Sequence, residues 1–156
     1  MKKSLFIIYF LITASAFGQD FTFRGHHWGA SVEEVIAREG EPSYAFIDYL
    51  YYDSSHVGFP ASLSFRFSAI PENGLDSAHY ILYVSNDEAV NFYNDLLGRF
   101  SALYGKATRY QDEHYFHYWN VSRTEISIKM RQFNNIINII IDYISPQSHL
   151  NIFRYF

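Results

Sequence analysis

The segment from Ser85 to Gly105 constrains the fold more than any other part of the sequence, because it predicts one long amphipathic helix. Ser85 and Glu88 have the spacing of a capping box, in which the two side chains bind free N–H groups of the first turn. Gly105 stands where a helix commonly ends. Apolar residues recur at helical spacing on one side: Ala89, Tyr93, Leu96, Leu97, Phe100, Leu103 and Tyr104. A helix with one apolar side needs a flat apolar surface to cover it, and a sheet provides one.

The first 18 residues have the pattern of a secretory signal peptide. Lys2 and Lys3 precede an apolar run over residues 5–12 that is too short to span a bilayer, and Ala14-Ser15-Ala16 offers a cleavage motif of small residues. We expect a signal peptide over residues 1–18 and a single exported domain over residues 19–156, in the periplasm or outside a bacterial cell. The chain has no cysteine, so we expect no disulfide and no lipid anchor attached through cysteine.

The charge of the chain argues against nucleic acids and anionic membranes as partners. The formal net charge is −4, and loss of the two positive charges of Lys2 and Lys3 with the leader would make it −6. Binding to either polyanion needs a basic surface. We therefore expect no nucleic-acid partner and no stable membrane insertion after the leader is cleaved.

A second capping box, from Ser31 to Glu34, predicts a short helix that stops before Gly40 and Pro42. Alternation of apolar and polar residues predicts strands over residues 61–69 and 124–131. Runs rich in aromatic and β-branched residues, bounded by turn residues, predict further strands over residues 44–52, 78–84, 110–121 and 136–144. Three strands follow each helix, so a duplicated α-β-β-β unit is an open alternative. The predicted fold class is α+β: an antiparallel sheet of about six strands, with one short and one long helix on one face.

Several predicted strands are apolar on both sides, although a sheet covered on one face should be polar on the other. The structural explanation is that the chain covers its own second face, for example with residues 150–156 or the turn around Trp28. The functional explanation is an exposed aromatic surface that binds a protein partner or a second copy of the chain. The rings that we expect on this surface are Tyr49, Tyr51, Tyr115, His117 and Trp119.

No motif in the sequence indicates a reaction, a metal or a cofactor. Adjacent His26 and His27 would point to opposite sides of an extended segment, and so would His114 and His117. No Gly-rich phosphate loop and no nucleophile elbow is present. The alternative to a binding module is a small periplasmic hydrolase that uses His26 or His114 as its base.

A resemblance to known proteins rests on two nearby stretches of the sequence. They are Phe23-Arg24-Gly25-His26-His27-Trp28-Gly29-Ala30-Ser31-Val32-Glu33-Glu34-Val35 and Glu39-Gly40-Glu41-Pro42. Together they resemble the opening of a group of small exported bacterial proteins of unknown function. More distantly, a capped helix, Gly-x-Pro and a strand meander are similar to the BamE-type outer-membrane assembly modules and the β-lactamase-inhibitor-protein fold. That likeness implies protein–protein binding on the sheet or its loops and brings no catalytic residues. The helix pair of those modules is not evident, and the assembly modules' lipid-anchoring cysteine is missing.

Overall fold

The computed structural model of the chain describes residues 22–56, 59–68, 74–109, 115–133, 136–146 and 148. The predicted signal peptide, His114 and the tail over residues 150–156 lie outside this part. Two helices are present within it, α1 (Val32–Glu39) and α2 (Asn86–Tyr104). A hairpin of two short strands, β1 (Thr22–Phe23) and β2 (His26–His27), precedes α1.

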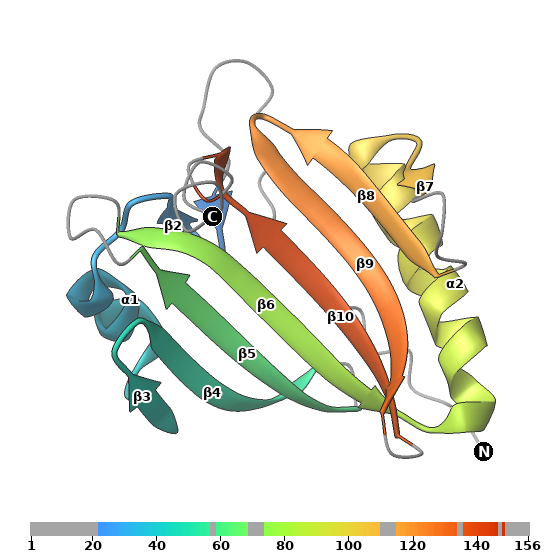
Figure 1. Cartoon of the computed structure of the whole chain (residues 1–156), viewed down its shortest axis with the longest axis horizontal. Helices are drawn as coiled ribbons and strands as arrows, with labels where there is room; N and C mark the ends of the chain where they lie inside the picture. Colours follow the sequence, from blue (N-terminus) through green and yellow to red (C-terminus); the bar gives the residue numbers. More distant parts are fainter. Residues whose placement is uncertain are drawn as a thin grey trace, which may run out of the picture.

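The other strands of the described residues form one antiparallel sheet of eight (Figure 1). They are β3 (Tyr44–Phe46), β4 (Tyr49–His56), β5 (Phe59–Phe67), β6 (Leu75–Val84), β7 (Thr108–Arg109), β8 (Phe116–Val121), β9 (Thr124–Phe133) and β10 (Ile136–Ile144). The predicted α+β class is confirmed, and the predicted count of about six strands is wrong. The run over residues 44–52 turns back at Ile47 and Asp48 to give two strands, and β7 is too short to leave a periodic pattern.

The two halves of the chain repeat one topology. The strand order is β3-β4-β5-β6-β10-β9-β8-β7, so each helix is followed by four strands that run from one edge of the sheet to its centre. The two meanders meet where β6 and β10 pair, with Ile81 opposite Ile140. This order resembles the proposed repeat, but with four strands in each unit instead of three.

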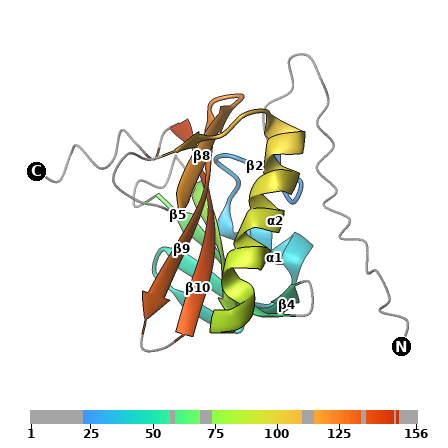
Figure 2. The same cartoon turned by 90° about the vertical axis from the view of Figure 1, so that its right-hand side faces the viewer.

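Both helices lie on the same side of the sheet (Figure 2). At α1 the predicted capping box is confirmed: Ser31 Oγ accepts from the Glu34 N–H (3.2 Å), and the Glu34 carboxylate accepts from the Ser31 N–H (2.8 Å). At α2 the predicted box does not form, because the Ser85 hydroxyl donates to the Glu88 carboxylate (2.7 Å) and caps no backbone N–H. No helix in the described part has the length and apolar composition of a membrane span.

The core lies between the helices and the sheet. Tyr93 and Phe100 of α2 are buried, as the helical spacing predicts, and each removes a whole ring from water, a gain of about 2 kcal/mol each. On the other half of the sheet, Phe23 of the hairpin packs edge-on against Phe65 of β5 and Tyr80 of β6. The hairpin and α1 thus complete the cover that α2 begins over β8 and β10.

Candidate binding surface

Strand register divides the sheet residues between the side under the helices and the opposite side, which we call the open face. On β6, Ala78, Tyr80 and Leu82 are buried under the helices. Their neighbours His79, Ile81 and Tyr83 alternate with them and so lie on the open face. On β10 the residues opposite these three are Asp142, Ile140 and Asn138.

The open face is apolar in places and polar in others. At the ends of β6 and β10 it carries Tyr83 and Ile136, both exposed, and nearer the middle Ile81 and Ile140. Strands β5 and β9 present polar side chains to the same face: Ser62, Ser64, Arg66, Glu125, Ser127, Lys129 and Arg131. Strands β6 and β10 therefore carry apolar residues on both faces, whereas β5 and β9 are polar on the open face.

Among the described residues, a group of exposed rings lies on the open face at the β3–β4 edge, and we call it the aromatic corner. It consists of Tyr44, Phe46, Tyr49 and Tyr51, which register places on one side of these strands. Tyr44 is 60% exposed, Phe46 58% and Tyr51 38%. The rings of Tyr49 and Tyr51 are nearly parallel, with centroids 5.7 Å apart, and Tyr44 lies 6.2 Å from Tyr51. The three tyrosine rings of the corner are thus neighbours, and Phe46 lies on the same side of the sheet as the cross-strand partner of Tyr49.

A hydrogen-bonded polar network adjoins the aromatic corner. Tyr49 interacts with Arg66, and the Arg66 guanidinium forms two 2.9 Å hydrogen bonds to Asp76. Arg66 also donates to Ser148 Oγ (2.6 Å). The Arg66 guanidinium is therefore held in place by a bidentate carboxylate, which is the strong form of this contact.

The network continues across β6, β10 and β9 around Asp142, which is buried. Asp142 lies 2.7 Å from His79 Nδ1 and 2.7 Å from Lys129 Nζ, and it accepts from Ser127 Oγ (3.0 Å). Burial alone would raise the pKa of Asp142, but the hydrogen bonds from His79 and Lys129 outweigh it and lower this pKa to about 2. The carboxylate is therefore ionised at neutral pH and bridges three strands.

The structure does not bring the five predicted contact residues together. Tyr49 and Tyr51 lie on the open face, in the aromatic corner. Trp119 is only 3% exposed and donates from Nε1 to the Gly105 carbonyl (2.8 Å) at the end of α2. His117 Nδ1 lies 2.8 Å from Tyr93 Oη, and Tyr115 packs edge-on against the same ring. The prediction that all five residues share one exposed surface is therefore wrong, because α2 covers the side of the sheet to which His117 and Trp119 point.

The sequence prediction missed Tyr44 and Phe46. It treated residues 44–52 as one strand, in which Phe46 and Tyr49 would point to opposite sides. The two-residue turn at Ile47 and Asp48 makes Phe46 and Tyr49 a cross-strand pair, and a pair shares one face. Asp48 was the available signal, because aspartate is rare inside strands and common in turns.

The hydrolase alternative named His26 and His114 as candidate bases, and the structure describes the surroundings of His26 alone. His26 is 3% exposed, and its Nε2 lies 3.1 Å from Glu39 Oε1; His114 lies outside the described part. Ser77, His79 and Asp142 do have the contacts of a serine triad, with Ser77 Oγ 3.2 Å from His79 Nε2. However, Ser77 is 1% exposed and donates its single proton to Asp76. The Ser77 hydroxyl is therefore part of the polar network and is not an accessible nucleophile.

The described residues contain no group of three or more histidine, aspartate or glutamate side chains placed to hold a metal ion. His26 is buried and His27 is exposed, in keeping with the opposite directions of neighbours in a strand. No protein-family model, curated protein or solved structure matches the chain.

Proposed function

We propose that this protein is an exported binding module of the bacterial cell envelope that docks a protein partner on its open face. The aromatic corner is the centre of the proposed contact. The observation that carries the proposal is that three of its four rings are more than a third exposed, on the face opposite α1 and α2. Clustered exposed aromatic rings on a globular protein typically mark interaction sites.

The partner would dock on side chains and would not add a strand to the sheet. The two edge strands, β3 and β7, have three and two residues. At the aromatic corner, an edge strand of three residues offers little backbone to a further strand, and short edge strands are a common protection against edge-to-edge pairing. Tyr44, Tyr49 and Tyr51 suit docking through side chains, because a tyrosine ring gives apolar area and its hydroxyl gives a polar contact.

The polar network would fix the position of the partner beside the rings. Arg66 and Lys129 are partly exposed and are held by Asp76 and Asp142. Such paired charges cost less to place in an interface than free ones, because their hydrogen bonds are already made. We therefore expect rings to supply most of the affinity and the network to supply orientation.

Site-specific photocrosslinking in the native cells tests this proposal. A photoreactive phenylalanine replaces Phe46 or, as the control, Leu103, which is 53% exposed on the opposite side of the molecule. We expect one discrete protein adduct from position 46 and none from position 103. We expect Tyr51→Ser to reduce the adduct roughly ten-fold, as is typical for removal of a central ring.

The outcomes separate the proposal from its rivals. Adducts of equal yield from positions 46 and 103, or none from position 46, would contradict docking at the aromatic corner. An adduct of twice the mass of the protein would instead support the alternative of a homodimer. N-terminal sequencing of the protein from an envelope fraction tests the export part, with a mature N-terminus near residue 19 as the expected result.

A further inference from the structure

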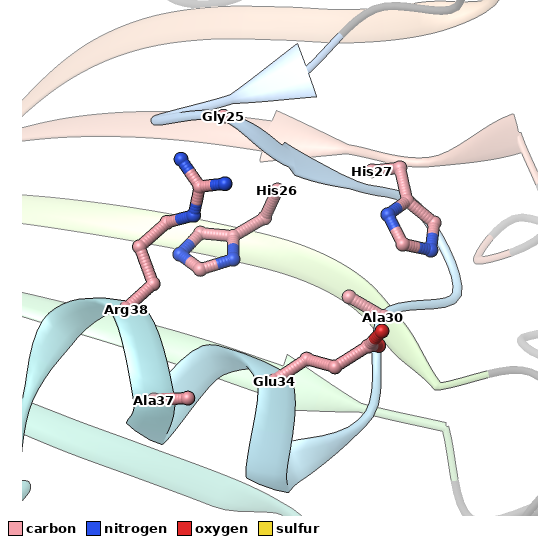
Figure 3. Close-up of a pocket in the computed structure, with 7 residues that line it drawn as sticks. All are labelled: Gly25, His26, His27, Ala30, Glu34, Ala37 and Arg38. Atoms are coloured by element: carbon pink, nitrogen blue, oxygen red, sulfur yellow. The ribbon is translucent and has the colours of Figure 1, made fainter.

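A pocket of about 520 Å³ lies between the β1–β2 hairpin and α1. Figure 3 shows His26 in its middle, the Arg38 guanidinium at one end, and His27 with the Glu34 carboxylate at the other. The pocket adjoins α1 and the hairpin, so it is separate from the open face. Its volume is in the range of pockets that hold small molecules.

Glu34 and Arg38 stand four residues apart on α1, a spacing at which acidic and basic side chains commonly pair. On α2 the same combination does pair, with Asp95 and Arg99 at 2.8 Å. On α1 the pair is open, because the Glu34 carboxylate accepts from the Ser31 N–H. Within the described residues the Arg38 side chain has no ion-pair partner, so its guanidinium is available to a ligand.

The Arg38 guanidinium lies beside Gly25 at one end of the pocket. It occupies the space that a side chain at position 25 would need, and Gly25 leaves that space free. His26 is buried and held by Glu39 through Nε2, so its ring has a fixed orientation beside the guanidinium. Arg24 fixes Glu39 in turn with two hydrogen bonds of 2.7 and 2.9 Å. The wall of the pocket is therefore pre-organised for binding.

We propose that this pocket binds a small zwitterion, with its carboxylate at Arg38 and its ammonium group at Glu34. The guanidinium fork matches a carboxylate, and Glu34 keeps an oxygen beyond the one used by the helix cap. The backbone positions of Glu34 and Arg38 are about 6 Å apart along the axis of α1. A free α-amino acid carries both charges on one carbon and cannot reach both ends. A dipeptide, with its charges about 7 Å apart, can reach both.

Titration with diglycine, followed by NMR of the α1 amides and the His26 ring, tests the proposal. We expect saturable shifts with diglycine and at least roughly ten-fold weaker binding of N-acetyl-diglycine, which lacks the ammonium group, and of glycylglycinamide, which lacks the carboxylate. Arg38→Gln should weaken diglycine binding by a similar factor. Arg99→Gln, the matched change on α2, should leave it unchanged.

Three results would overturn the proposal. One is the absence of shifts with diglycine in a protein whose spectrum shows that it is folded. Another is equal binding of diglycine and its two blocked forms, which would mean that charge at the ends plays no part. The third is unchanged binding by Arg38→Gln with an intact spectrum, which would place the ligand elsewhere.

Discussion

The indole Nε1 of Trp28 donates a 2.8 Å hydrogen bond to Thr124 Oγ1 across 96 positions of the sequence. Trp28 lies in the turn after the N-terminal hairpin, and Thr124 begins β9 in the other half of the sheet. Two backbone hydrogen bonds attach the same turn to β6. The Gly29 N–H donates to the Leu75 carbonyl, and the Leu75 N–H donates to the Ala30 carbonyl. The turn therefore links the two meanders on the helix side of the sheet.

The hydrogen bond between Trp28 and Thr124 should contribute measurably to stability. Thr124 is fully buried, so Trp28→Phe leaves its hydroxyl without this donor and should cost about 1–3 kcal/mol in the free energy of unfolding. Urea denaturation of Trp28→Phe, Thr124→Val and the double variant measures the coupling. Because removing both partners leaves no unsatisfied hydroxyl, the double variant should lose less than the sum of the single losses. Strict additivity would show that the bond carries no energy.

Stability should fall with acid in two pH ranges. Burial, then the nearby charge of Arg109, lowers the pKa of His117, so the unfolded chain takes up a proton first as pH falls through about 6.5. The pKa of Asp142 is lowered to about 2 in the folded protein. The stabilisation that ionised Asp142 provides is therefore complete above about pH 4 and is lost as pH falls towards 2. Burial would raise the pKa of Glu39, but His26 and Arg24 lower it to about 2, so Glu39 acts in the same range.

Urea midpoints measured from about pH 8 down to about pH 2 test this profile. His117→Gln should reduce the change of stability with pH in the upper range. Asp142→Asn should reduce it in the lower range, where Asp142 contributes on the order of 2 kcal/mol to the free energy of unfolding. A stability that rises on acidification in either range would contradict the directions given.

The buried carboxylate of Asp142 should matter far more than an exposed one. Asp142→Asn removes the charge that faces His79 and Lys129 and should cost about 3 kcal/mol. Asp95→Asn is the matched control, because its pair with Arg99 on α2 is exposed on both sides and should cost less than about 1 kcal/mol. Chemical denaturation at neutral pH measures both. Similar losses would show that the network contributes no more than a surface ion pair.

Gly98 in α2 should tolerate a side chain and gain from it. It lies on the exposed side of the helix, and an added Cβ would meet no atom within 4 Å. Gly98→Ala should therefore stabilise the protein by about 1 kcal/mol, the difference in helix propensity. Gly105→Ala should destabilise it, because Gly105 ends α2 at a φ of 86° that alanine adopts at a cost. The two thermal midpoints should move in opposite directions.

Local patterns predicted much of the fold. The stripe from Ala89 to Tyr104 identified α2 and the residues that it buries, since helical spacing puts them on one side whatever they pack against. Leu103 was included in that stripe and is exposed, because it lies in the last turn of the helix. Ser31 and Glu34 likewise predicted the start of α1, because a capping box needs only four consecutive residues. The turn at Ile47 and Asp48 was missed, since it lies inside a run of aromatic and apolar residues that reads as a single strand.

The candidate sites depended more on the tertiary structure. Tyr49 and Tyr51 were predicted as contact residues, whereas Trp119 was assigned to the same surface and lies under α2. The pocket beside His26 could not be predicted, because it needs the hairpin to lie against α1. The contacts of Asp142 with His79 and Lys129 come from the pairing of β10 with β6 and β9, which no sequence spacing specifies.

The sequence alone determined which residues share a side of each helix or strand, because backbone geometry fixes the direction of successive side chains within one element. It therefore determined the apolar side of α2, the cap of α1 and the alternation along β5, β6 and β9. Only the tertiary structure decided which side of the sheet the helices cover. That choice depends on packing between segments far apart in the chain, and it buries Trp119 while it leaves Tyr51 exposed.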